Sequence, residues 1–137
     1  MPASCDTSIL VPALLAWHAH HRAAREQLAR TDAIPDHVLV EAYAVLTRLP
    51  DARRPPGPVA AEALRALPHG VLELPGRDRL DLLERLGRHR VTGGAAYDGL
   101  VAEVARRHGH RLLSADHRAR ATYDAVGVDY TLIDLSA

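Results

Sequence analysis

Cys5-Asp6-Thr7-Ser8 is the stretch around which the fold is expected to form, because a short extended segment, Pro2 to Cys5, stops there at a carboxylate and a helix follows. Ser8 is the predicted N-cap of that helix, which we expect to run to Trp17. Open α/β sheets bind their ligands at the carboxyl ends of strands. Asp6 is therefore the first candidate for a functional site.

The composition is typical of one globular domain. The chain has 137 residues, of which 47% are hydrophobic and 25% are charged, and we expect a single domain over residues 1–137. No apolar run is long enough to span a membrane and no basic leader precedes the first one, so we expect no membrane contact and a cytoplasmic location. The single cysteine, Cys5, agrees with a reducing compartment.

Several residue types are missing, and their absence excludes whole mechanisms. All 17 Lys+Arg residues are arginine, and the chain has no Lys, Asn or Phe. A P-loop lysine, a Schiff base and a zinc site with several cysteines are therefore excluded. The formal charge of +0 gives no sign of nucleic acid, so such a partner would need a local patch or a bound metal. Chemistry is left to carboxylates, histidines, hydroxyls and arginines.

Strand and helix patterns alternate along the rest of the chain, which indicates a parallel sheet covered by helices on both faces. Ala33 to Pro35 is interpreted as an extended link, and Pro50 to Pro58 as a loop rich in Pro and Arg. Further strands are predicted at Val71 to Leu74, Arg111 to Ser114 and Val128 to Ile133. Helices are predicted at His18 to Arg30, Pro35 to Leu49, Val59 to Leu67, Asp78 to Arg88 (with Leu80, Leu83 and Leu86 at helical spacing), Ala95 to His108 and a last segment ending at Ala125.

Four carboxylates occupy two kinds of position, strand ends and apolar helix faces. Asp6 and Asp116 follow strand ends, whereas Glu41 and Asp98 lie on apolar helix faces. Charged groups rarely point toward a core unless they are paired or bind a metal. Clustered carboxylates are ligands for hard cations such as Mg²⁺ or Mn²⁺. We therefore predict that the four side chains converge on a divalent metal site.

Each acid also has a simpler structural interpretation. Asp6 and Asp116 are suited to capping a turn or a helix, which is a common role of Asp at strand-to-helix junctions. Asp98 could form a salt bridge with an arginine. Glu41 would be exposed if its helix were rotated by one residue. The metal hypothesis depends on all four acids occurring together in a chain with little other chemistry.

Other polar residues are weaker candidates. Ser8 and Ser114 each lie two residues from an acid, where a hydroxyl can orient a water, but no histidine is placed to make either one a nucleophile. His18 and His21 are one helical turn apart, yet the neighbouring arginines favour a solvated face over a metal site. The arginines that we consider for phosphate contacts are Arg53, Arg54 and Arg118.

The chain resembles the PIN-domain ribonucleases, and among them the VapC-like toxins of bacterial toxin–antitoxin pairs. The resemblance covers nearly the whole length and shows in Asp6-Thr7-Ser8, in Pro35 through Leu49, in Gly94 through Asp98 with the helix after it, and in Leu112 through Asp116. It implies a three-layer α/β/α sandwich with a parallel sheet of about five strands. Ala119 departs from the family, because the toxins commonly have an aromatic residue there.

The resemblance also implies an activity. It assigns Asp6, Glu41, Asp98 and Asp116 to an acidic metal site for Mg²⁺ or Mn²⁺, and it puts Ser8 and Ser114 in the places of assisting hydroxyls. RNA would be the substrate, a VapB-like antitoxin would block the site, and the chain would form a homodimer. Cleavage by water in line with the leaving group would produce a 5′-phosphate and a 3′-hydroxyl.

Two rival functions remain open at this stage. An aspartate-based phosphatase would also use Asp6, but such enzymes usually have a lysine, which this chain lacks, and a second acid where Thr7 stands. A PIN-like module that binds RNA or a protein partner without catalysis would keep the fold and would fail to bind Mn²⁺.

Overall fold

All residues from 1 to 137 are described by a computed structural model of the chain, in which five short strands are all parallel. The strands form two hydrogen-bonded groups, and Asp32 connects them. Its backbone N–H donates to the Ala3 carbonyl at 2.8 Å, and its carboxylate accepts from the Ala3 N–H. The groups are β1 (Ala3–Cys5), β4 (Arg111–Ser114) and β5 (Tyr130–Leu132), in the order β1-β4-β5, and β2 (Ala33–Pro35) with β3 (Gly70–Leu72).

The chain reverses its direction across the sheet between β1 and β4. From β1 it proceeds through β2 to β3 on one side, and it then returns to place β4 on the other side of β1, with Cys5 opposite Leu113. Such a reversal opens a crevice outside the carboxyl ends of the two strands, which is where open α/β sheets bind ligands. Asp6 follows β1 and Asp116 follows β4 by two residues, so both predicted strand-end acids lie at this point.

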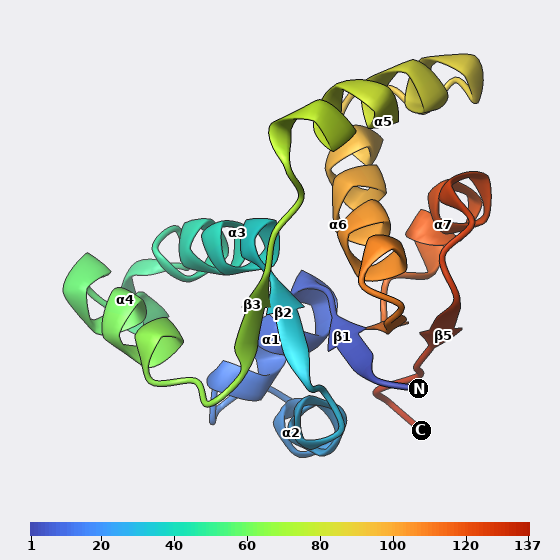
Figure 1. The fold of residues 1–137 in the computed structure, drawn as a ribbon. Helices are drawn as coiled ribbons and strands as arrows, with labels where there is room; N and C mark the ends of the chain where they lie inside the picture. The colour runs from blue at the N-terminus through green and yellow to red at the C-terminus, as the bar shows by residue number, and fades with distance from the viewer.

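Helices cover the strands on both sides. In Figure 1, β1, β2 and β3 lie between α3 and α4 on one side and α6 and α7 on the other, and β5 lies below α7. α1 packs against β1 and β4, and α6 packs against β2 and β4. The helices are α1 (Thr7–Leu14), α2 (His21–Ala29), α3 (Asp36–Leu46), α4 (Gly57–Arg65), α5 (Gly76–Arg88), α6 (Ala95–Arg107) and α7 (Arg120–Val126), with 3-10 turns at Asp51–Arg53 and His117–Ala119. The predicted α/β architecture is confirmed.

Several element bounds differ from the sequence prediction, and three of the differences matter for the site or the sheet. Asp6, not Ser8, is the N-cap of α1, because its side chain accepts the Ser8 backbone N–H and α1 already begins at Thr7. The predicted link Ala33–Pro35 is a buried strand, since it pairs with β3 along its whole length. α1 ends at Leu14 rather than Trp17, and a turn separates it from α2.

The buried face of α5 includes only one of the three leucines that the sequence analysis placed at helical spacing, Leu86. Leu82 and Leu86 are buried, whereas Leu80 and Leu83 are 66% and 58% exposed. The four leucines form two overlapping helical stripes, so spacing alone does not decide which one faces the core. Gly99 of α6 allows the close packing of this pair of helices, because a Cβ there would lie 2.8 Å from a methyl group of Leu86.

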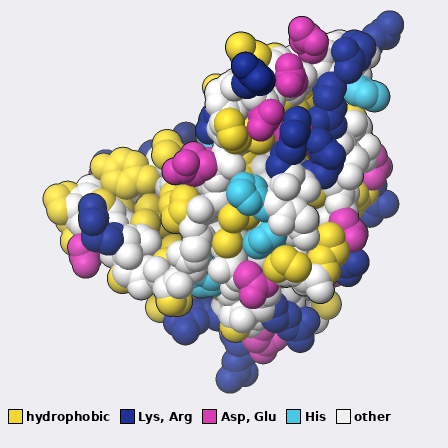
Figure 2. Space-filling model, in the orientation of Figure 1, with side chains coloured by type: hydrophobic (Ala, Val, Ile, Leu, Met, Phe, Trp, Pro, Cys, Tyr) yellow, Lys and Arg dark blue, Asp and Glu magenta, His cyan; other side chains and the backbone are white.

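The surface is neutral overall but uneven. Five of the 17 arginines lie between Arg77 and Arg90, on α5 and the turn after it. Figure 2 shows dark blue side chains gathered at the upper right, where Figure 1 places α5, and yellow side chains over α3 and α4. No helix of the structure is both long and apolar enough to cross a membrane.

Candidate functional site

Asp6 lies at the centre of the site, 7% exposed, and accepts four hydrogen bonds. Its Oδ1 accepts from the backbone N–H of Ser8 at 3.1 Å and from the Ser8 hydroxyl. Its Oδ2 accepts from the hydroxyl of Ser114 and, at 2.7 Å, from that of Tyr123. All four partners are donors, which is the arrangement that suits an ionised carboxylate. The capping role and the candidate functional role therefore belong to the same side chain.

The hydroxyls of Ser8 and Ser114 connect Asp6 to the chain that leaves β4. Each gives its single proton to Asp6, and each accepts a backbone N–H: Ser8 from Ala115 at 2.7 Å and Ser114 from Asp116 at 3.0 Å. The two hydroxyl oxygens are 3.5 Å apart. The strand ends of β1 and β4 are thus held together by side chains whose protons all point at one carboxylate.

No cation neutralises Asp6. Burial raises the pKa of its carboxyl, and the hydrogen bonds from Ser114, Ser8 and Tyr123 oppose that shift without cancelling it. Ionised Asp6 in turn raises the pKa of nearby groups, among them Cys5, whose thiol is held protonated by burial and by this charge. Negative charge at this place is therefore costly, and a positive ligand would relieve the cost.

Asp98 lies within electrostatic reach of the other three acids. Burial raises the pKa of Asp98 to about 6, and the charges of Asp116, Glu41 and Asp6 contribute. Burial and the charge of Asp6 raise the pKa of Glu41 as well. The charges that act on Asp98 belong to residues after β1 and β4 and on α3, so the structure brings all four acids within electrostatic reach at Asp98. The side chains do not, however, form a group of three His, Cys, Asp or Glu residues close enough to hold an ion.

Comparison with known proteins defines the family. The PIN domain family model matches residues 4–125. Ribonuclease VapC40 of Mycobacterium tuberculosis is 41% identical over 130 residues, which is 93% of this chain and 96% of that protein. Ribonuclease VapC27 of the same species is 39% identical over 128 residues, or 93% of each chain. The chain belongs to the PIN-domain family, in its VapC-like branch.

A solved PIN-domain structure agrees with the fold. The crystal structure of Mycobacterium tuberculosis VapC20, which its description calls a toxin that cleaves the sarcin–ricin loop, superposes with a TM-score of 0.69. It shares 24% sequence identity and covers 87% of this chain and 93% of that one. The predicted resemblance to VapC-like PIN domains and the predicted fold class are both confirmed.

Two residues of this PIN domain that touch the acids were missed by the sequence analysis. Tyr123 of α7 is fully buried and donates to Asp6, and burial is the first cause of the strongly raised pKa of its hydroxyl. His37 of α3 has its Nε2 3.3 Å from Oε1 of Glu41. Only the second contact has a sequence signal, since His37 and Glu41 are four residues apart on one helix.

The remaining candidates have partners within the PIN domain. The guanidinium of Arg53 lies 4.1 Å above the ring of Trp17, and Arg54 donates to Asp51 and to the Leu49 carbonyl. Arg118 is 95% exposed and 3.4 Å from Asp116. Nothing in these contacts tests the predicted role of the three arginines toward RNA. Of the His18 to His21 cluster, one ring nitrogen of His18 accepts a backbone N–H, and one of His21 contacts the Pro12 carbonyl oxygen.

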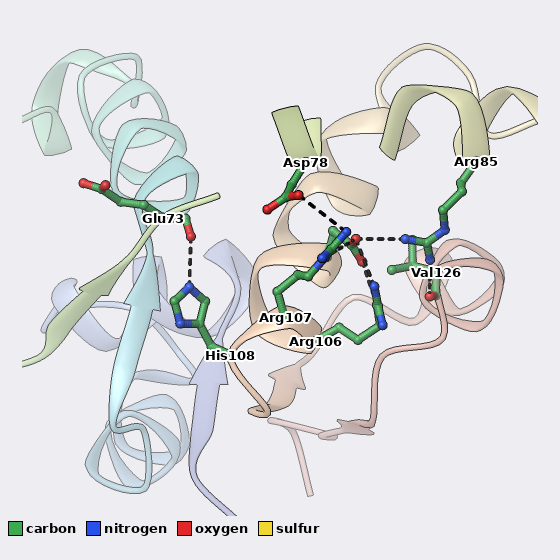
Figure 3. Close-up of polar contacts among 8 residues, drawn as sticks. Glu73, Asp78, Arg85, Arg106, Arg107, His108 and Val126 are labelled. Carbon is green, nitrogen blue, oxygen red and sulfur yellow. Dashed lines mark hydrogen bonds and ion pairs between the residues drawn. The ribbon is translucent and has the colours of Figure 1, made fainter. Parts of the chain in front are cut away.

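A second buried carboxylate, Glu103 of α6, lies apart from these contacts and has the opposite surroundings. It is 0% exposed and accepts hydrogen bonds from Arg85, Arg106 and Arg107 at 2.7–3.1 Å. In Figure 3 these guanidinium groups converge, while Arg85 also reaches the Val126 carbonyl and Arg107 lies toward Asp78. Burial raises the pKa of Glu103, but the arginines outweigh burial, so its pKa is lowered. This cluster joins α5, α6 and α7 and is structural.

Proposed function

We propose that this single PIN domain, residues 1–137, is a metal-dependent endoribonuclease that acts as the toxin of a toxin–antitoxin pair. The observation that carries the proposal is the buried carboxylate of Asp6 at the end of β1, which has no cation beside it, together with Asp98 of α6, whose pKa is raised by burial and by the charges of Asp116, Glu41 and Asp6. The relatives named ribonuclease support the chemistry. VapC20, described as a sarcin–ricin loop cleaving toxin, shares the fold.

The residues fit a hard divalent cation in their chemistry. All four are oxygen donors. Burial raises the pKa of Asp6, Glu41 and Asp98, and neighbouring carboxylates add to the shift at Glu41 and Asp98, so a cation would relieve the cost of ionising them. The buried Thr7 hydroxyl, directly after Asp6, has no hydrogen-bond partner. Because no three acids are yet close enough to share an ion, Mg²⁺ or Mn²⁺ binding requires that some carboxylates turn toward it.

The four acids have two tasks in this proposal. Asp6, Asp98 and Asp116 would bind the cation directly, and Glu41 would either bind it or position the attacking water. Asp6 is the most firmly held of them, because four donors fix its carboxylate. Ser8 and Ser114 keep Asp6 oriented and hold the backbone that leads to Asp116. Preorganisation of this kind lowers the cost of binding.

The reaction is hydrolysis of an RNA phosphodiester bond. When bound, the cation would supply the Lewis acidity that makes water nucleophilic and offsets charge on the attacked phosphate. Water attacks phosphorus in line, the bond to the 3′-oxygen breaks, and the products carry a 5′-phosphate and a 3′-hydroxyl. Glu41 is 35% exposed at its side chain, which leaves it accessible to an incoming water.

The expected partners complete the proposal. RNA is the substrate, a VapB-like antitoxin blocks the acidic site, and two copies of the chain form a homodimer in the cytoplasm. The arginines proposed to contact RNA phosphates are Arg53, Arg54 and Arg118. Arg118 is the best placed, since it is exposed and borders Asp116.

Cleavage of RNA by purified protein with Mn²⁺ tests the proposal. We expect wild type to cut single-stranded or structured RNA, EDTA to stop it, and Asp6→Asn to be inactive. Asp81→Asn, an exposed acid of α5, is the matched control and should keep full activity. Equal cleavage by wild type and Asp6→Asn would identify a contaminating nuclease and reject the assignment.

Two other functions predict different results. A PIN module that only binds RNA or protein would show no Mn²⁺-dependent rise in Tm, because a ligand that binds only the native state must stabilise it. An aspartate-based phosphatase would trap beryllium fluoride on Asp6. The second is disfavoured by the absence of lysine and by Thr7, which stands where such enzymes have a second acid.

A further inference from the structure

We propose that His37 is a positioning residue that fixes the carboxylate of Glu41, and that Tyr97 holds the His37 ring in place. The inference rests on the proposed ribonuclease function, because it concerns the acid that would bind the cation or orient the water. Its basis is a chain of contacts between α3 and α6, two helices that pack against each other beside the acidic site. The chain begins at Tyr97 and ends at Glu41.

The His37 nitrogen has one acidic neighbour. Its Nε2 is buried and makes no hydrogen bond within ordinary geometric limits, yet it lies 3.3 Å from Oε1 of Glu41. A buried N–H or ring nitrogen left without a partner is unfavourable, so the histidine gains by presenting Nε2–H to this carboxylate oxygen. Because the distance is already short, only the angle at Nε2–H has to improve for the bond to form. His37 thereby limits the orientations available to Glu41.

The His37 ring is itself held on one face. The Tyr97 ring stacks on it, with centroids 5.2 Å apart and planes 7° from parallel. The backbone at this point is also fixed, because the His37 N–H donates to Asp36 at 2.8 Å in the first turn of α3. A ring fixed in this way loses little further entropy when it bonds to Glu41, which is how a supporting residue increases the precision of a site.

Tyr97 is mostly exposed, so core packing does not explain why its ring stacks on His37. It is 57% exposed, so it contributes little to the core, and it directly precedes Asp98 in the first turn of α6. Its stack on His37 couples the position of Asp98 on α6 to that of Glu41 on α3. The two helix-borne acids are thus linked by a pair of aromatic rings.

Matched variants separate the hydrogen bond from the stack. His37→Phe keeps a flat ring for Tyr97 but has no donor, whereas His37→Gln keeps an N–H near the place of Nε2 but has no ring. We expect His37→Phe to lower kcat about tenfold with KM changed less than about twofold, as loss of a supporting hydrogen bond does. His37→Gln should recover most of kcat, and Tyr97→Ala should lie between them. His89→Phe, an exposed histidine at the end of α5, is the control for a histidine removed elsewhere.

Two readouts do not require catalysis. In metal-free protein, nitrogen-15 NMR of the histidines should show His37 protonated at Nε2, with its signal assigned by its loss in His37→Phe. Calorimetric titration with Mn²⁺ should show about tenfold weaker binding for His37→Phe than for His89→Phe. An Nδ1-protonated His37, or equal kcat and equal Mn²⁺ affinity in these two variants, would overturn the positioning role. Failure of the wild type to cleave RNA would reject the ribonuclease function, while the NMR result would still decide whether His37 bonds to Glu41.

Discussion

Asp6 and Glu103 are both buried carboxylates, and the fold surrounds them in opposite ways. Glu103 is met by three arginines and has a lowered pKa, so its charge is fully compensated. Asp6 is met only by hydroxyls and a backbone N–H, has further acids nearby, and has a raised pKa. A chain with 17 arginines places none of them against Asp6. The difference separates a carboxylate that stabilises the fold from one that is kept available for a ligand.

Asp6→Asn gives the largest expected change, and it is a change in activity. An amide is a poor ligand for a hard cation and cannot replace the charge, so RNA cleavage should fall at least about 100-fold, or about 2.7 kcal/mol in the activation barrier. Stability should stay within about 1 kcal/mol of wild type, because a buried charge without a counter-ion is removed. Thermal unfolding and RNA cleavage assays on the same preparation measure both effects. A large loss of Tm with activity unchanged would reverse the contrast drawn between the two acids.

Glu103→Gln should produce the reverse pattern. Removing the negative charge leaves three guanidinium groups facing a neutral amide, which destabilises a buried pair; since the arginine side chains are 27–40% exposed, we expect about 2 kcal/mol rather than more. Activity per folded molecule should remain, because no contact joins this cluster to the acids at the site. Urea unfolding gives the stability, and a cleavage assay well below the midpoint gives the activity. Loss of cleavage in the folded state would show that the cluster is coupled to the site.

The two environments also predict opposite responses to pH. The pKa of Asp98 is raised to about 6, so between pH ~4 and ~6 the native state binds more protons than the unfolded state, and stability falls as pH rises. Asp98→Asn should remove this trend, worth on the order of 1 kcal/mol because the side chain is partly solvated. Glu103 has a lowered pKa, so its stabilisation is present above the unfolded value near 4.3 and is lost as pH falls below it.

Unfolding measured from pH 4 to pH 7 in metal-free buffer tests this difference. Mn²⁺ affinity should also rise with pH through about 6, since protons and the cation compete for Asp98. A stability profile of Asp98→Asn that runs parallel to that of wild type would show that Asp98 titrates normally.

The sequence indicated the candidate acids but not their surroundings. Asp6 and Asp116 were selected because a strand followed by an acid is a local pattern, and Glu41 and Asp98 because they interrupt apolar helix faces; their role as a metal site stays a prediction. Tyr123 was missed because its contact with Asp6 spans 117 residues and exists only after α7 has folded against the sheet. Glu103 was missed for another reason. With Arg106 and Arg107 one turn away, it has the pattern of an exposed helix pair, and its burial under α5 and α7 has no local signal.

Tyr123→Phe is a smaller change that acts on Asp6 alone. It removes one of the four donors to Asp6, and a hydrogen bond to a charged group is worth about 1.5–3 kcal/mol. We expect a loss of stability of about 1.5 kcal/mol. We also expect a few-fold loss of cleavage, because the carboxylate becomes harder to ionise. Tyr130→Phe is the control, since its hydroxyl bonds to an exposed acid, Asp124. Equal Tm values for the two variants would show that Asp6 does not depend on Tyr123.

Arg118→Ala should have the smallest effect on the fold and should change only RNA binding. The side chain is 95% exposed and 3.4 Å from Asp116, so removing this surface pair should change stability by less than about 0.5 kcal/mol. If Arg118 contacts one RNA phosphate, binding should weaken at low salt, and the slope of log affinity against log salt should become about 0.7 less steep. Asp6→Asn as the background for this measurement prevents cleavage during the titration. Arg120→Ala, a nearby exposed arginine at the start of α7, is the control. An unchanged slope in both variants would exclude Arg118 from the RNA contacts.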